Sequence, residues 1–318
     1  MRQLRAALIL SILPAISSAQ SPDLPALAER FTRMTAVTGF ERAALDSVQA
    51  LLPGARRDRA GNVIVERGSD PATLIACPFD EVGYVVGGIR DDGWLTLRRV
   101  GARAPNALWD QSHEGQRVTV WGRQRALPAV VGVRSTHLTR GRAQTEAPFT
   151  VDDAVVDIGA SNAAEVRAAG VDVLAPVARE KKVTRYGSGL LAGPSAGRRS
   201  ACAALVAAWL GAPRVEGRVV VAFLVEQELS LRGLRGLRTI AGREGPFAST
   251  ILVDGAPGDL GVRRAWVDTA FTRRFPTLGT VSRAALATRY PASAVETVAL
   301  DDLVLLRDQL AAQIGGGR

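Results

Sequence analysis

The chain has 318 residues, of which 47% are hydrophobic and 22% are charged, and its formal net charge is +9. This composition excludes a disordered protein and allows a large buried core in one or two domains. The positive charge comes almost entirely from arginines that are scattered among acidic residues, with no basic stripe interleaved with aromatic residues. Nucleic-acid binding is therefore not expected.

Residues 1–20 have the form of a secretory signal peptide. Arg2 and Arg5 precede an apolar run from Ala6 to Ile16, and small residues follow up to Ala19. The run is shorter than the roughly 20 residues that a membrane span needs, so export is favoured over an anchor. No later stretch is long and apolar enough to cross a membrane. We therefore expect a bacterial-type protein that is secreted or periplasmic, with no membrane span after cleavage.

The next part of the chain predicts helices, then strands, then a run of short strands. Residues 24–52 carry helical periodicity, with a break near Thr38. Short apolar runs then predict strands at residues 63–65, 73–77 and 84–88. From residue 88 to residue 185 the strands are short and separated by turns rich in Gly, Asp and Pro, which is typical of a small β-barrel. These strands are predicted at residues 94–100, 117–121, 130–133 and 155–158.

After Arg185 the pattern changes to helices alternating with buried strands. The predicted helices are residues 200–210, 234–243 and 298–314, and the predicted strands are residues 218–225 and 250–253. Both strands are continuous apolar runs, as in a sheet that is covered on both faces. The chain is therefore expected to be an α/β protein with a β region inserted into it.

Four motifs in these segments share residues with the sequence motifs of one enzyme family. They are A-C-P-F-D-E-V-G from Ala76 to Gly83, G-R-R-S-A-C from Gly197 to Cys202, E-Q-E-L-S-L-R-G from Glu226 to Gly233, and R-Y-P-A-S-A-V-E from Arg289 to Glu296. With them the chain resembles the M42 family of two-metal aminopeptidases. The resemblance implies an aminopeptidase-like α/β/α sandwich with a mixed sheet, formed by residues 21–87 and 186–318. It also implies an inserted small β-barrel, residues 88–185, that makes subunit contacts.

The resemblance further implies a site for two divalent metal ions such as Zn or Co, but most ligand letters are missing. The two histidines of the family fall on Pro78 and Ala292, and its bridging aspartate falls on Gly197. Glu228 and Asp254 remain, one on each side of the site. One carboxylate and water do not hold a zinc ion against dilution. From the sequence we therefore expect no bound cofactor.

The catalytic base is also expected to be absent. The base glutamate of the family falls on Gln227, whose amide cannot accept a proton at a useful pH. Asp80 matches the aspartate that orients the missing histidine. The only histidines, His113 and His137, lie in the inserted region, so no shift of the alignment restores the imidazole ligands. A serine-hydrolase motif around Ser195 is disfavoured because no histidine follows it.

Four charged residues near these motifs are candidates for the lining of the former cleft: Glu81, Arg198, Arg199 and Arg232. Without metal ions, Glu228 and Asp254 would repel each other. We expect Arg198 or Arg199 to neutralise them, because the letters G-R-R replace D-N-R of the family. A site made of carboxylates alone, for Mg²⁺ or Ca²⁺, is disfavoured because no acidic cluster has the needed spacing.

The two cysteines, Cys77 and Cys202, lie beside two of the motifs. An exported protein with an even number of cysteines permits one disulfide. Two buried free thiols are the alternative, because unpaired cysteines usually lie in the core.

Three functions stay open at this point. The favoured one is an exported, catalytically inactive relative of the M42 aminopeptidases, which binds peptides or N-terminal amines in the old cleft or acts as a partner subunit. The second is an active metal-dependent aminopeptidase with an altered site. The third is a purely structural oligomeric scaffold. The resemblance implies homo-oligomers formed through the β-barrel.

Overall fold

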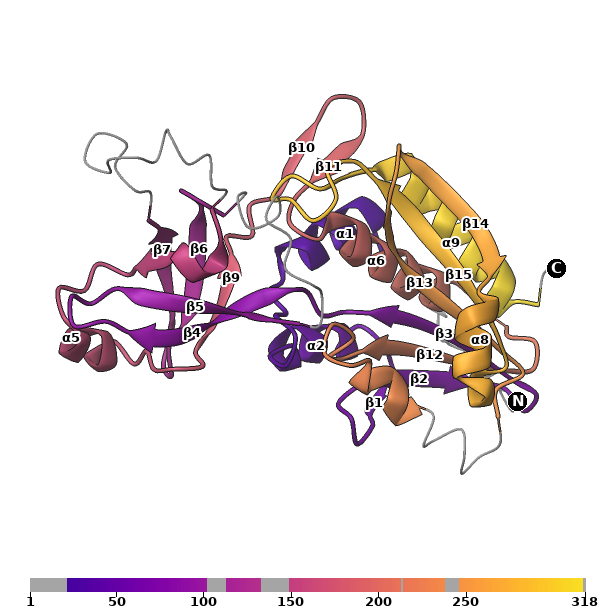
Figure 1. Cartoon of the computed structure of the whole chain (residues 1–318). Coiled ribbons are helices and arrows are strands. Elements are labelled where there is room, and N and C mark those ends of the chain that lie inside the picture. Colours follow the sequence, from indigo (N-terminus) through magenta and orange to yellow (C-terminus); the bar gives the residue numbers. More distant parts are fainter. Residues whose placement is uncertain (1–21, 102–112, 133–148, 213, 238–245, 317–318) are drawn as a thin grey trace, which may run out of the picture.

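The computed structural model of the chain describes residues 22–101, 113–132, 149–212, 214–237 and 246–316. They form an α/β domain around a seven-stranded sheet and a closed β-barrel that lies beside it (Figure 1). Within these ranges, no helix combines the length and apolar character needed to span a membrane. The predicted signal peptide lies outside the described residues.

The sheet of the α/β domain is mixed, with the strand order β1-β2-β12-β3-β13-β15-β14. The four inner strands β12, β3, β13 and β15 are parallel, and the other pairings are antiparallel. The strands are β1 (Arg56–Arg57), β2 (Val63–Arg67), β3 (Ala72–Pro78), β12 (Arg218–Leu224), β13 (Ser249–Pro257), β14 (Gly261–Val267) and β15 (Thr280–Thr288). Because the inner strands are parallel, their carboxyl ends meet at one edge of the sheet.

Helices cover both faces of the sheet, which confirms the expected α/β/α architecture (Figure 1). One face is covered by α1 (Leu24–Arg33), α2 (Arg42–Gln49), α6 (Ala196–Gly211) and α9 (Leu300–Ile314). The other face packs against Leu234, Leu237 and the residues around α8 (Thr269–Arg274) and η2 (Pro276–Leu278). Helix α6 is buried along most of its length, and its many alanines let it approach both the sheet and the neighbouring helices.

The six strands of the barrel close in the order β4-β5-β8-β7-β6-β9. They are β4 (Gly83–Ile89), β5 (Leu95–Val100), β6 (Arg117–Trp121), β7 (Ala126–Val131), β8 (Val155–Asp157) and β9 (Pro176–Arg179), with η1 (Val151–Asp153) before β8 and α5 (Ala163–Ala168) before β9. Alternate residues such as Val86, Leu97 and Val120 fill the interior. The inserted barrel is therefore confirmed. Its predicted boundaries stay a prediction, and residue 88 lies inside β4.

A small sheet of β10 (Thr184–Tyr186), β11 (Leu190–Ala192) and β16 (Thr297–Ala299) joins two distant parts of the α/β domain. The pairing of β11 with β16 brings the segment before β16 next to the start of α6. The main-chain N–H of Gly193 donates to the carbonyl oxygen of Glu296 over 3.0 Å. The fourth sequence motif is thereby placed beside the second one, at the edge where the parallel strands end.

Candidate functional site

A cavity of about 290 Å³ lies where the barrel meets the carboxyl ends of the parallel strands. The barrel contributes Arg99 and Arg179 to its lining, and the α/β domain contributes Arg198, Glu228 and Asp254. The carboxyl edge of a parallel sheet is where α/β proteins usually bind ligands. This cavity is therefore the candidate functional site.

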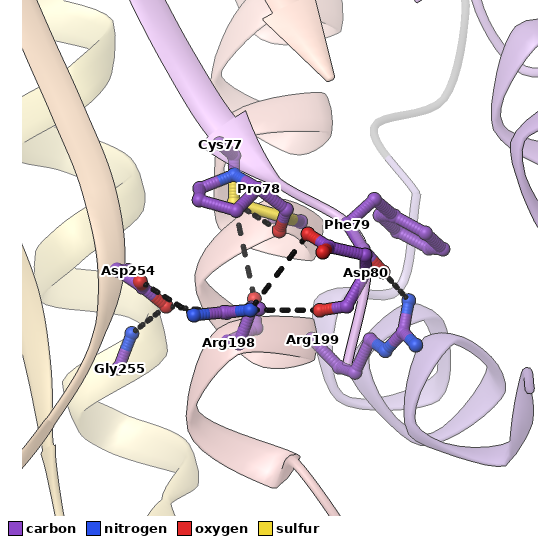
Figure 2. The surroundings of a disulfide bond; sticks show 9 residues. Cys77, Pro78, Phe79, Asp80, Arg198, Arg199, Asp254 and Gly255 are labelled. Atoms are coloured by element: carbon purple, nitrogen blue, oxygen red, sulfur yellow. Dashed lines mark hydrogen bonds and ion pairs between the residues drawn. A yellow bond between two sulfur atoms is a disulfide. The ribbon is translucent and has the colours of Figure 1, made fainter. Parts of the chain in front are cut away.

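Arg198, in the first turn of α6, is the centre of an ion cluster in this cavity. Its Nε donates to Asp254 Oδ1 over 2.9 Å and its Nη2 donates to Asp254 Oδ2 over 3.0 Å. Its Nη1 donates to the carbonyl oxygen of Asp80 over 2.8 Å (Figure 2) and lies 3.0 Å from Glu228 Oε1. Burial disfavours the charge of Arg198, but these carboxylates raise its pKa above the usual value. Arg198 is therefore a permanent cation between the two retained acids.

Asp80 connects the end of β3 to the turn that carries Glu228. Its carboxylate is completely buried, and its Oδ2 accepts a hydrogen bond from the main-chain N–H of Glu228 over 2.8 Å. Its Oδ1 lies 3.9 Å from Arg198 Nη1. Burial raises the pKa of Asp80, although Arg198 acts in the opposite direction. Asp80 thus fixes the backbone of Glu228 and belongs to the group of acids around Arg198.

Glu81 forms a second ion cluster next to the first. Its Oε2 is bound by Lys181 Nζ and accepts a hydrogen bond from Ser195 Oγ over 3.1 Å. Burial alone would raise the pKa of Glu81, but Lys181 and Arg199 lower it to about 2. Lys181 was not among the site residues predicted from the sequence. A signal existed, since Lys181 and its neighbour Lys182 are the only lysines in the chain.

Arg199 points away from the two retained acids. Its side chain is fully buried, its Nη1 donates to the carbonyl oxygen of Phe79 over 2.5 Å, and its guanidinium stacks 4.2 Å from the Phe79 ring centre. Its Nη2 lies 3.6 Å from Glu81 Oε1. Of the two candidate arginines, only Arg198 therefore contacts the acids that the family uses as metal ligands.

Gly197 occupies a position with no room for a side chain. Its main-chain N–H donates to Glu296 Oε1 over 2.8 Å. A Cβ atom on Gly197 would lie 2.4 Å from Thr288 Cγ2, 2.8 Å from Glu296 Oε1 and 3.2 Å from the Cα of Gly255. Since the start of α6 packs directly on β13 and β15 here, packing itself closes the position that matches the bridging aspartate of the family.

Ala292, at the position of the second family histidine, takes part through its main chain. It has a left-handed backbone with φ 61°. Its N–H donates to Glu296 Oε2 over 3.0 Å, and its carbonyl oxygen accepts from Arg179 Nη1 over 2.8 Å. Burial raises the pKa of Glu296. Glu296 thus holds the segment around Ala292 and the start of α6 together, a role that sequence analysis missed.

Arg179 is held in place by a buried group of barrel side chains. Its Nη2 lies 2.7 Å from Nε2 of His113, which in turn lies 2.6 Å from the Tyr84 hydroxyl. Burial, together with the positive charges of Arg179 and Arg99, lowers the pKa of His113 to about 2. His113 is therefore a neutral positioning partner of Arg179. The other histidine, His137, lies outside the described residues.

The turn after β12 carries two further sequence candidates, Gln227 and Arg232. Gln227, at the position of the family base, has a buried Oε1 that accepts no hydrogen bond from any described residue. Arg232 does not line the cavity: its side chain is 59% exposed and pairs with Glu226. The main-chain N–H of Glu226 donates to Glu41 Oε1 over 2.8 Å. Burial raises the pKa of Glu41 to about 7, which makes it a titratable support of this turn that sequence analysis did not identify.

Cys77 and Cys202 form a disulfide with an S–S distance of 2.03 Å. The bond joins the end of β3 to α6, four residues after Arg198 (Figure 2). Both half-cystines are fully buried. The strand that carries Pro78 and Asp80 is therefore covalently linked to the helix that carries Arg198.

The residues at the five family ligand positions do not fit a pair of divalent metal ions. Pro78, Gly197 and Ala292 supply no side-chain ligand, and the carboxylates of Glu228 and Asp254 are both bound by an arginine. Within the part of the chain that the structure describes, no group of three or more His, Cys, Asp or Glu side chains is arranged to hold a metal ion. The arrangement forms an ion-paired cleft with retained acids.

Comparisons with known proteins agree with this architecture. The family model for M42 glutamyl aminopeptidase matches residues 61–254. Lysyl aminopeptidase of Pyrococcus furiosus is 25% identical over 215 residues, which are 66% of this chain and 61% of that protein. Glutamyl aminopeptidase of Lactococcus lactis is 29% identical over 149 residues, which are 44% of this chain and 41% of that protein. The chain spans between 41% and 65% of the lengths of the curated relatives that it matches.

A solved structure shows the same fold at low sequence identity. The TET1 peptidase of Pyrococcus horikoshii superposes with a TM-score of 0.77 at 22% identity, over 92% of this chain and 99% of that chain. The similarity includes the α/β domain and extends over most of the described residues. It therefore supports the assignment of the fold.

The comparisons correct one expectation from the sequence. We expected no cofactor, but the M42 family binds divalent metal ions, so the matches to its family model and to a lysyl aminopeptidase imply metal ions as the cofactor. The expectation of no cofactor is wrong on this ground, although the five ligand positions differ from those that the family uses. Since the family model covers more than half of the chain, the protein belongs to the M42 glutamyl aminopeptidase family.

Proposed function

We propose that this M42-family protein binds short peptides by their N-terminal ammonium group and does not hydrolyse them. The observation that carries the proposal is the contact of Arg198 with both Asp254 and Glu228. A fixed guanidinium there neutralises only part of the acidic group, so the remaining negative charge attracts an ammonium ion. The cavity is still open to a ligand, because it retains a volume of about 290 Å³.

The absence of hydrolysis is supported by the residues that would have to activate water. Peptide hydrolysis in this family needs a general base beside the bridging water. Gln227 stands at the position of that base and cannot accept the proton. The position of the bridging carboxylate is Gly197, where a Cβ atom would lie 2.4 Å from Thr288 Cγ2.

Thermal unfolding of the purified, tag-free protein tests peptide binding. Ligands that bind the native state raise the melting temperature, and saturation at 100 times Kd adds about 2.7 kcal/mol to the free energy of unfolding. We expect di- and tripeptides with a free N-terminus to raise the melting temperature and N-acetylated versions not to do so. Equal melting temperatures with and without free peptides would contradict the binding role.

The second candidate is an active metal-dependent aminopeptidase. Family membership favours it, because divalent metal ions are the cofactor that the family implies. The retention of Glu228 and Asp254 also favours it. Elemental analysis of the purified protein, combined with turnover of amino-acid anilides before and after EDTA, separates the two candidates. Stoichiometric zinc or cobalt with EDTA-sensitive turnover would establish the enzyme and overturn the binding role.

We also propose export and assembly into homo-oligomers through the barrel. The form of residues 1–20 supports export, and N-terminal sequencing of the protein from a periplasmic fraction tests it, with cleavage near Ala19 as the expected result. The related TET1 peptidase is described as assembling into a tetrahedron or a large octahedral shell, which supports oligomers here. Light scattering after gel filtration measures the state. Assembly without any peptide effect on melting would favour the third function, a structural scaffold.

A further inference from the structure

The cavity has one wall from the α/β domain and one from the barrel, and the charged residues of the two walls differ. On the α/β wall, the carboxyl groups of Glu228 and Asp254 share the single guanidinium of Arg198, with oxygen atoms 3.0 and 2.9 Å from its nitrogen atoms. The fully buried carboxyl group of Asp80, which does not line the cavity, lies 3.9 Å from the same guanidinium. The buried carboxyl group of Glu296 lines the same wall. This side of the cavity is therefore acidic even after Arg198 is counted.

The barrel wall is basic. The charged side chains that the barrel strands bring to the lining are both arginines, Arg99 from β5 and Arg179 from β9. Among their electrostatic neighbours, His113 and Tyr84 are neutral at ordinary pH, since burial lowers the pKa of His113 to about 2 and raises that of Tyr84. The carboxyl groups of Glu81 and Glu296, which also line the cavity, act on Arg179 and favour its charged form. Lys181 follows β9 and also lines the cavity, paired with Glu81. The barrel wall thus contributes the positive charges of Arg99 and Arg179 to the cavity.

We propose that the ligand of this cavity is a zwitterion, a free amino acid or a dipeptide, which places its ammonium group near Glu228 and Asp254 and its carboxylate near Arg99 and Arg179. This inference rests on the proposed peptide-binding function and adds recognition of the second end of the ligand. In a longer peptide the C-terminal carboxylate lies more than two residues away from the N-terminal ammonium group. The ammonium group at one end of the ligand and the carboxylate at the other end therefore define the class of ligand.

The size of the cavity agrees with a ligand of this class. Its volume is about 290 Å³, roughly twice the ~150 Å³ of a cavity that holds one benzene molecule and near the lower end of ordinary ligand pockets, about 300 Å³. Two extended residues span about 7 Å. The volume therefore suits a ligand of one or two residues, whereas a long peptide would have to extend out of the cavity.

Calorimetric titration of the full chain with four ligands tests the inference. They are alanyl-alanine, its N-acetyl derivative, its C-terminal amide and penta-alanine. We expect alanyl-alanine to bind about tenfold or more tightly than each of the other three, because each lacks one of the two charges or carries it too far away. Equal binding of the amide or of penta-alanine would overturn the zwitterion and leave N-terminal peptide binding intact. Failure of all four ligands would overturn the proposed function itself.

A matched pair of variants assigns the carboxylate end. Arg99→Gln removes one charge of the barrel wall, and Arg98→Gln removes the charge of its neighbour, whose side chain is 64% exposed and pairs with Asp152 on the surface. We expect Arg99→Gln to weaken alanyl-alanine about tenfold without changing the affinity for the amide, and Arg98→Gln to change neither. Equal losses for both ligands, or no loss, would overturn the role of Arg99. If Arg99→Gln does not fold, the four-ligand comparison on the unmodified protein decides.

Discussion

Arg198 and Asp254 form a two-point ion pair between the start of α6 and the end of β13, with nitrogen–oxygen distances of 2.9 and 3.0 Å. Arg198 is 12% exposed and Asp254 is 30% exposed, so water screens the pair only in part. Two parallel hydrogen bonds fix the guanidinium plane as well as its charge. The electrostatic balance of the acidic wall therefore depends on one side chain.

The first prediction concerns the stability that Arg198 contributes. Arg198→Ala leaves Asp80, Glu228 and Asp254 close together without a cation, and breaking such a buried group costs about 3 kcal/mol or more. Urea unfolding measures the loss. The control is Arg123→Ala, which removes an exposed partner of Asp172 and should change the free energy of unfolding by less than about 1 kcal/mol. Equal effects of the two variants would contradict the central role of Arg198.

The same variant also predicts a change in metal uptake. Without Arg198, the carboxylates of Glu228 and Asp254 become available to a cation, and divalent ions bind carboxylate oxygens. After dialysis against zinc and then against buffer, Arg198→Ala should retain more zinc per chain than the unmodified protein or the Arg123→Ala control, as measured by elemental analysis. The idea fails if all three proteins retain the same amount.

The second prediction concerns the crowding at Gly197. Gly197→Ala puts a Cβ atom 2.4 Å from Thr288 Cγ2 and 2.8 Å from Glu296 Oε1, so the variant should lose about 3 kcal/mol of unfolding free energy. Gly211→Ala at the other end of α6 meets nothing within 4 Å and should be neutral or stabilising by up to about 1 kcal/mol. Adding Thr288→Ser, which removes Cγ2, should recover part of the loss. Identical stability of the two glycine variants would refute the packing argument.

The third prediction is a pH dependence that comes from Glu41. Burial raises its pKa from 4.5 to about 7, so the folded state binds the proton more tightly than the unfolded state. This contribution to stability is complete below pH 4.5 and is lost as the pH rises through 7. The difference between the two pKa values corresponds to about 3 kcal/mol.

Glu41→Gln keeps an oxygen acceptor for the N–H groups of Gly39 and Glu226 but cannot titrate. Relative to this variant, the unmodified protein should therefore lose about 3 kcal/mol of unfolding free energy between pH 4.5 and pH 8. Urea unfolding of both proteins at several pH values measures the difference. A difference that stays constant across this range would show that Glu41 ionises as an ordinary surface acid.

The fourth prediction concerns the disulfide between Cys77 and Cys202. The bonded residues are 125 positions apart, and closing a loop of that size in the unfolded chain stabilises the native state by about 2–5 kcal/mol. Dithiothreitol should lower the unfolding free energy of the unmodified protein by this amount. The double variant Cys77→Ala and Cys202→Ala should be less stable from the start and should not respond to dithiothreitol. A response of the double variant would assign the effect to something other than this bond.

Much of the fold could be predicted because its signals are local. The helical periodicity before residue 52, the apolar runs of β3 and β12 and the turn-rich barrel strands all follow from the sequence alone. Strand β15 was not predicted, because Arg283 interrupts its apolar pattern. In the structure Arg283 Nε donates to Asp268 Oδ2 over 2.6 Å and the guanidinium lies 5.0 Å from the Phe271 ring centre. These partners come from α8 and the residue before it, which the strand pattern itself cannot reveal.

Only those residues of the candidate site that lie within the sequence motifs could be predicted. The change to G-R-R identified Arg198 and Arg199 as candidates, but their opposite directions depend on how α6 packs against the end of β3. The contact of Glu296 with Gly197 depends on the pairing of β11 with β16. Arg179 belongs to the barrel, far from any motif in sequence. These parts of the site depend on contacts between distant segments, which the sequence motifs do not reveal.

The close approach of α6 to β13 and β15 has a consequence for engineering. Restoring the metal ligands of the family would require an aspartate at position 197. Its side chain would clash with Thr288 and Glu296. A redesign would first have to draw the opening turn of the helix away from the strands, and that displacement would also move Arg198, four residues before the sulfur bridge that ties the helix to β3. The path of the backbone, as well as the choice of side chains, therefore separates this chain from the metal-site geometry of its family.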